Sequence, residues 1–80
     1  MKGDKLKARL LSGNFANWSF KDACQLACHC GWNHTRTSGS HHIFTHSLPA
    51  VPSLNIQNKN GQAKPYQMRQ MKDQIQAHNL

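Results

Sequence analysis

The sequence predicts an α+β protein in which helices cover one face of a three-stranded antiparallel sheet. Two observations support this prediction. Before residue 31 and after residue 64, apolar residues recur at the three- and four-residue spacing of a helix. Between residues 32 and 57 the periodicity changes to two, as in half-buried strands, and glycine and proline clusters separate the segments. The expected order is helix, helix, three strands, helix.

Two short helices are expected in the first third of the chain. Residues 4–12 place leucines among basic residues and stop before Gly13, as a short amphipathic helix does. Ser19 and Asp22 then form a start that is similar to a capping box. Helical spacing continues through Phe20, Ala23, Cys24, Ala27 and Cys28. We expect this second helix to end at Gly31 and to contact the core.

Three strands are expected in the middle of the chain. Residues 32–37 and 41–46 are two candidate strands, and the Ser-Gly-Ser turn at residues 38–40 suits a short antiparallel hairpin. Residues 47–53 contain two prolines and are expected to form a loop. Residues 54–57 are a short third strand.

The last predicted helix starts at Pro65, because proline favours the first helical position. Met68, Met71 and Ile75 follow at helical spacing and form its apolar stripe. We assign this stripe to the core. With all helices on one side of the sheet, its other face is expected to be open.

Length and charge narrow the class of protein. A chain of 80 residues supports one domain, spanning residues 1–80, with a small core that buries about 60% of the unfolded surface. Ten Lys and Arg against three Asp and Glu give a net charge of +7. This excess predicts an anionic partner, either a nucleic acid or an acidic protein, although a basic surface that serves only solubility stays an alternative.

The sequence contains no sign of a membrane segment, a signal peptide or a metal site. No apolar run approaches the roughly 18 residues of a membrane span, so we expect a cytoplasmic protein with no membrane contact. On a continuous helix, Cys30 points about 160° away from Cys28, so the cysteines do not converge on zinc. We expect small, buried, reduced thiols and no cofactor. The acidic residues are equally scattered, at Asp4, Asp22 and Asp73.

The histidines after the predicted turn are the candidate catalytic residues. Imidazole titrates near neutral pH and both takes and gives a proton, as a general base must. If Phe44 points toward the helices, strand alternation places His42 and His46 on that side and His41 on the open face. This favours His41 as the base, with His42 as the alternate, and a structural role for His46. Ordinary surface histidines are the competing interpretation.

Five blocks of the chain, in order, resemble the HicA (YcfA-like) mRNA interferase toxins. They are Gly31-Trp32, Arg36-Thr37, and residues 39–46, 54–57 and 61–70. The resemblance extends over nearly the full length, including an N-terminal helix that one subgroup carries. It implies a double-stranded-RNA-binding-domain-like fold, metal-independent cleavage of mRNA, and a HicB-type antitoxin that masks the active site.

The resemblance also assigns the catalytic histidine. The family's Gly-x-His motif falls on His41, and members that carry the histidine one place later keep His42 in consideration. Two positions depart from the family pattern: His34 replaces an apolar strand residue and Ser47 replaces a proline. Neither departure touches His41, although His34 is expected to loosen the first strand.

Four further residues are candidate RNA contacts, and we expect a basic open face to hold the RNA. The four residues are Ser40, Lys64, Arg36 and Arg69. Lys64 combines a cation with the free N–H groups of the helix that begins at Pro65, a combination suited to phosphate. Arg36 and Arg69 are the weaker candidates, because a charged residue on a helix or strand is usually only solvated, and a solvated loop lysine is the alternative for Lys64. Two other functions are compatible with the same fold. One is a non-catalytic RNA-binding module, and the other is a protein whose basic surface binds only an acidic partner.

Overall fold

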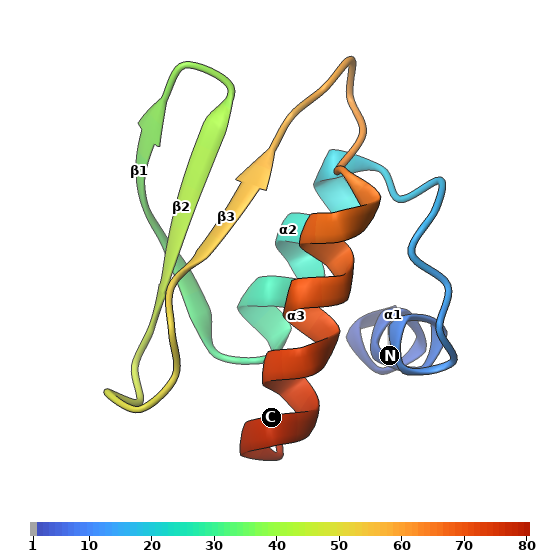
Figure 1. The fold of residues 1–80 in the computed structure, drawn as a ribbon, viewed down its shortest axis with the longest axis vertical. Helices are drawn as coiled ribbons and strands as arrows, with labels where there is room; N and C mark the ends of the chain where they lie inside the picture. The colour runs from blue at the N-terminus through green and yellow to red at the C-terminus, as the bar shows by residue number, and fades with distance from the viewer. Residues whose placement is uncertain (1) are drawn as a thin grey trace.

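A layer of helices covers one face of a three-stranded antiparallel sheet in the computed structural model, which describes residues 2–80 (Figure 1). The predicted order of elements is confirmed. The elements are α1 (Lys2–Leu11), α2 (Phe20–His29), β1 (Trp32–Ser38), β2 (His41–His46), β3 (Leu54–Gln57) and α3 (Pro65–His78). The first helix begins two residues earlier than the 4–12 expected, and β1 extends one residue further. The α+β class and the strand ranges of β2 and β3 agree with the sequence prediction.

The sheet has the order β1-β2-β3, and a two-residue turn joins β1 to β2. Gly39 occupies the first position of this turn with a φ of 60°, a conformation that favours glycine and suits a type II′ hairpin. Ser38 and His41 are therefore register partners. The sharp turn places His41 at the first position of β2.

A bulge in β1 changes which side chains share a face. The register shifts between His34 and Arg36, and the Thr35 hydroxyl at the shift donates to the Ile43 carbonyl oxygen at 3.1 Å. His34 pairs with Phe44 on the helix-covered face, whereas Arg36 pairs with Ile43 on the open face.

The core lies between the sheet and the helices. α2 and α3 contact the sheet, whereas α1 packs against α2 and α3 on the side away from the strands (Figure 1). The largest fully buried side chains are Trp18, Trp32, Phe44, Leu10, Leu26, Ile56, Met68 and Met71. The two methionines belong to the stripe that the sequence assigns to the core, and that assignment is confirmed.

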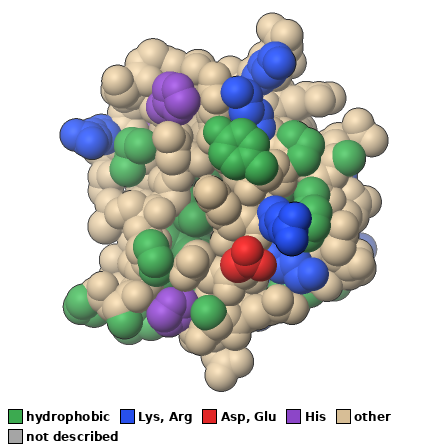
Figure 2. All heavy atoms as spheres, in the orientation of Figure 1, with side chains coloured by type: hydrophobic (Ala, Val, Ile, Leu, Met, Phe, Trp, Pro, Cys, Tyr) green, Lys and Arg blue, Asp and Glu red, His purple; other side chains and the backbone are tan. Residues whose placement is uncertain are grey.

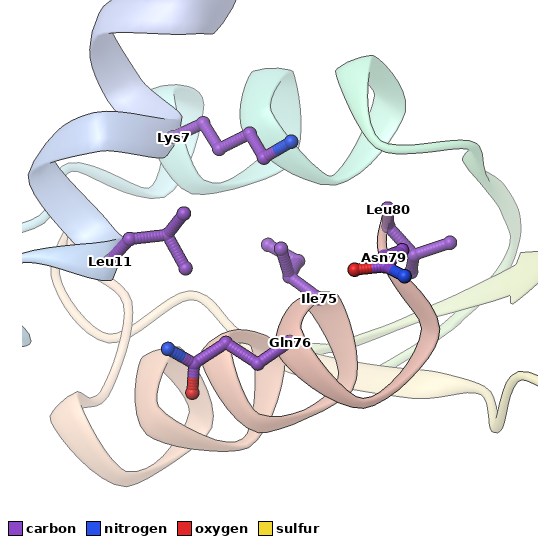
Figure 3. A pocket seen from close by; sticks show the side chains of 6 residues that line it. All are labelled: Lys7, Leu11, Ile75, Gln76, Asn79 and Leu80. Atoms are coloured by element: carbon purple, nitrogen blue, oxygen red, sulfur yellow. The ribbon is translucent and has the colours of Figure 1, made fainter.

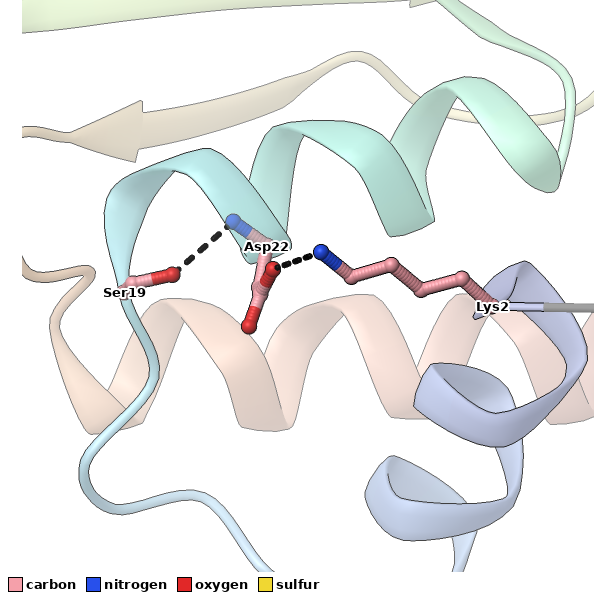
Figure 4. Close-up of polar contacts among 3 residues, drawn as sticks. All are labelled: Lys2, Ser19 and Asp22. Carbon is pink, nitrogen blue, oxygen red and sulfur yellow. Dashed lines mark hydrogen bonds and ion pairs between the residues drawn. The ribbon is translucent and has the colours of Figure 1, made fainter.

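The start of α2 is capped as predicted and is also linked to α1. Ser19 Oγ accepts a hydrogen bond from the Asp22 N–H at 3.0 Å (Figure 4). The Asp22 carboxylate in turn forms an ion pair with Lys2 at 3.2 Å (Figure 4). The carboxylate also lies near the positive end of the helix dipole.

The end of α2 is fitted around His46. Gly31 has a φ of 103°, and a Cβ at this position would lie 2.5 Å from His46 Nε2. His46 is only 9% exposed, and its Nε2 donates to the Cys30 carbonyl oxygen at 2.8 Å. Its Nδ1 accepts from the Leu48 N–H at 3.0 Å. Both ring nitrogens are thus used within the fold, which confirms the structural role expected for this histidine.

Candidate functional site

His41 lies at the start of β2 with its ring on the open face of the sheet. Its side chain is exposed, whereas Phe44 is buried under the helices, as the strand alternation predicts. The Nδ1 atom of His41 lies 3.2 Å from Oδ1 of Asn55. Asn55 pairs with Ile43, the next open-face residue along β2, so the contact is a diagonal one across the two strands.

His42 faces the helices and has a different set of contacts. Its ring is half-buried, and its centroid lies 4.5 Å from that of Phe20 at the start of α2. Its Nδ1 is 3.3 Å from the Thr37 hydroxyl and 3.4 Å from His34 Nε2. Polar and aromatic contacts within the protein therefore hold this ring.

His34, the first departure from the family pattern, is part of the same cluster. Its Nε2 lies 3.0 Å from the Thr37 hydroxyl, and its ring centroid lies 5.2 Å from that of Phe44. β1 continues through His34 to Ser38, and the bulge in its pairing with β2 begins directly after His34, where a loosening of the first strand was expected.

Two glutamines hold the turn that carries His41, and sequence analysis missed both. Gln57 Nε2 donates to Ser40 Oγ at 3.1 Å, and Gln57 itself pairs with His41 across the strands. The Gln57 N–H donates to Oε1 of Gln67, a residue of α3 that is only 3% exposed, at 2.7 Å. The Ser40 carbonyl oxygen accepts from the Asn58 N–H at 2.9 Å. The first turn of α3 is thus connected through β3 to the residue before His41.

The candidate RNA contacts lie on more than one surface of the molecule. Arg36 is on the open face because it pairs with Ile43, but Arg69 lies on α3 in the helical layer. Lys64 is the N-cap residue of α3, and its side chain makes no capping hydrogen bond. Figure 2 shows Lys and Arg side chains over the helical layer. The candidate RNA contacts therefore extend around the edge of the sheet, from Arg36 past the Ser40 turn to α3.

Residues 2–80 contain neither a metal-binding cluster nor a membrane-spanning helix. Across residues 2–80, no group of three or more His, Cys, Asp or Glu side chains is placed to hold a metal ion. None of the helices between Lys2 and His78 is long and apolar enough to cross a membrane.

The cysteines are free thiols, but they are not all buried as expected. Cys30 is buried, Cys24 is half-buried and Cys28 is exposed. Burial, followed by the neighbouring Cys28, raises the pKa of Cys24 to about 11. Burial also raises the pKa of Cys30, against a smaller opposing effect of Lys7. A thiol with a raised pKa is a poor nucleophile at neutral pH, so Cys24 and Cys30 are not candidate catalytic groups.

A cavity of about 340 Å³ lies between α1 and the C-terminal end of α3 (Figure 3). Its lining consists of Lys7, Leu11, Ile75, Gln76, Asn79 and Leu80. Because Pro65 and Gln67 lie at the opposite end of α3, the cavity is separate from the histidine site.

Comparison with known proteins identifies the family. The model of the HicA toxin of bacterial toxin-antitoxin systems matches residues 20–77, which include both candidate histidines and every strand. Helix α1 lies outside the matched range. Neither a curated protein nor a solved structure matches the chain. The match covers more than half of the sequence, and the chain therefore belongs to the HicA toxin family of bacterial toxin-antitoxin systems.

Proposed function

We propose that this protein is the toxin of a HicA/HicB-type pair and that it cleaves mRNA as a metal-independent endoribonuclease. In this proposal His41 is the catalytic residue and residues 1–80 form one toxin domain. Membership of the HicA family supports the toxin assignment. The charge of +7 supports an RNA substrate, because cations that neutralise phosphates supply much of the affinity for nucleic acid.

The proposed reaction uses the nucleophile that RNA carries. His41 removes the proton of a ribose 2′-OH, and the 2′-oxygen attacks the adjacent phosphorus atom. The bond from phosphorus to the 5′-oxygen breaks, and that oxygen receives the proton that the His41 imidazolium gives back, which returns the ring to its neutral form. The products are a 2′,3′-cyclic phosphate and a free 5′-hydroxyl. Neighbouring cations stabilise the negative charge that develops on the phosphate oxygens.

The accessibility of its ring favours His41 over His42 and His46 as the catalytic histidine. The ring of His41 is exposed on the open face, whereas His42 is packed against Phe20 and both ring nitrogens of His46 are hydrogen-bonded inside the fold. A general base must reach the proton that it removes, so the accessible ring is the better candidate. Arg36 on the same face, with Ser40, Lys64 and Arg69 around the edge, supplies the proposed backbone contacts.

The proposal includes a HicB-type antitoxin as the protein partner. A partner that masks His41 has to cover the hairpin end of the sheet, where Arg36 also lies. Its contact surface should therefore carry acidic residues and compete with RNA for the toxin.

The test is a cleavage assay with purified toxin and a single-stranded RNA in the presence of excess chelator. We expect cleavage to continue, with cyclic phosphate ends on the products, and to be lost in a folded His41→Ala variant. Cleavage that stops in chelator and returns with magnesium would refute the metal-independent reaction. RNA binding without any cleavage would favour the non-catalytic module instead.

A further inference from the structure

The contact between His41 and Asn55 indicates which ring nitrogen of His41 carries a proton. The two side chains meet on the open face, with Nδ1 of the imidazole 3.2 Å from Oδ1 of the amide. A carboxamide oxygen only accepts hydrogen bonds. With the amide oxygen facing the ring, as in this structure, the imidazole donates, which puts the proton of the neutral ring on Nδ1 and the lone pair on Nε2.

We propose that Asn55 is a positioning residue for RNA cleavage, because it holds His41 as the Nδ1–H tautomer with Nε2 free to act as the base. This inference rests on the proposed ribonuclease function. Asn55 acts through His41 and has no assigned contact with the substrate. Its role is similar in kind to the third group of catalytic triads, which fixes the tautomer and orientation of a histidine.

The neutral amide suits a group that must both take and give a proton. When Nε2 accepts the proton of the 2′-OH, the ring becomes an imidazolium whose Nδ1–H still donates to the Asn55 oxygen. The same hydrogen bond therefore holds the ring in both protonation states. The backbone supports this geometry, since Asn55 and His41 belong to adjacent, paired strands, and β3 is in turn bonded to α3 through Gln67.

His46 provides an internal reference for the opposite tautomer. Its Nε2 faces a carbonyl oxygen, which only accepts, and its Nδ1 faces the Leu48 N–H, which only donates. His46 is thus an Nε2–H histidine, whereas His41 is the Nδ1–H form. Nitrogen chemical shifts distinguish the two forms. In one spectrum of the wild-type protein, the shifts of His46 therefore serve as the standard against which the tautomer of His41 is read.

The experiment measures ring nitrogen shifts of the neutral histidines in ¹⁵N-labelled protein, together with RNA cleavage. Asn55→Val removes the acceptor at an exposed strand position that valine tolerates. Asn55→Asp keeps an accepting oxygen. Asn33→Val is the matched control, because Asn33 is also exposed and pairs with Thr45 on the same open face.

We expect His41 to be protonated on Nδ1 in the wild type, in Asn55→Asp and in the control. In Asn55→Val the two tautomers should exchange, and kcat should fall by about tenfold to a hundredfold, within the contribution of a general base, with KM changed little. The aspartate variant should recover most of this loss.

Two results overturn the inference and leave the ribonuclease assignment intact. They are a wild-type His41 protonated on Nε2, and an Asn55→Val variant with unchanged tautomer and rate. Undiminished cleavage by His41→Ala has a different meaning, since it removes His41 from the reaction and the role of Asn55 with it.

Discussion

Two adjacent histidines on β2 have the same chemistry and opposite surroundings. His41 lies on the open face and contacts Asn55, whereas His42 lies under the helical layer against Phe20 and beside Thr37. The difference arises from strand alternation, which sends successive side chains to opposite faces of a sheet. A shift of one residue in the pairing of β2 would exchange the two environments.

A histidine whose ring nitrogens are already hydrogen-bonded inside the protein is expected to have a structural role. His42 shares Thr37 with His34, and deeper on the same face His46 uses both of its ring nitrogens inside the protein. His41 has one nitrogen directed at an amide and the other available. A proton-transfer role is therefore expected on the open face and a stabilising role on the covered face.

The largest expected effect separates the two neighbours directly. His41→Ala should lower the cleavage rate by about 10²- to 10⁴-fold, the usual contribution of a general base, and change the free energy of unfolding by less than about 0.5 kcal/mol. His42→Ala should retain cleavage and lose about 0.5–1.5 kcal/mol of stability, because the contact with Phe20 is removed. Initial rates on RNA and urea unfolding measure both quantities. Loss of cleavage in His42→Ala alone would move the catalytic role by one residue.

Among the histidines of the covered face, His46 is expected to contribute most to stability. His46→Ala should lower the free energy of unfolding by about 2–4 kcal/mol, because it leaves the Cys30 carbonyl and the Leu48 N–H without their partner and opens space beside Trp32. Urea unfolding is the measurement, and Thr45→Ala on the open face is the control. Cleavage per folded molecule should be unchanged. A stable variant that has lost cleavage would place His46 in the reaction instead.

A smaller effect is expected for RNA affinity. If Lys64 and Arg36 each contact a phosphate, alanine at either position should weaken binding of all sequences alike and lower the salt slope by about 0.7 per lost contact. Labelled RNA titrated into His41→Ala protein at several salt concentrations gives these slopes. Lys5→Ala, on the exposed surface of α1, is the matched control. An effect of Lys64 without one of Arg36 would restrict the RNA path to the helical side.

The smallest effect concerns the thiols of the helical layer. Because the pKa of Cys24 is raised to about 11 from 9.0, its thiolate fraction at pH 8 is about a hundredfold below that of an ordinary thiol. Alkylation followed by mass spectrometry should modify the exposed Cys28 first and Cys24 only as the pH approaches 11. Modification of both at similar rates at pH 8 would mean that α2 opens readily from the sheet.

Local patterns predicted most of the fold. The turn at Gly39 predicted that His41 begins β2, and the alternation about Phe44 predicted which side chains of β2 face the helices. Both predictions were possible because turn chemistry and strand alternation act over a few residues. The capping residue Ser19 and the start of α3 at Pro65 were likewise predictable from local rules.

Features that depend on tertiary contacts were not predictable. The bulge at Thr35 places His34 and Arg36 on opposite faces, although they are two apart in sequence. The contact of Asn55 with His41 and the burial of Gln67 depend on strand register and on where α3 crosses β3. The face on which Arg36 lies has the same origin, because the bulge determines it.

Helix α1 has a consequence for how this protein should be produced. The family match begins at residue 20, yet Leu6, Leu10 and Trp18 all belong to the buried core. Burial of each such side chain contributes about 1.5–3 kcal/mol, and domains of this kind are stable by only about 5–15 kcal/mol in total. An expression clone trimmed to the matched range would lose much of that margin. Recombinant work should therefore start before α1, because the segment that identifies the family is shorter than the segment that folds.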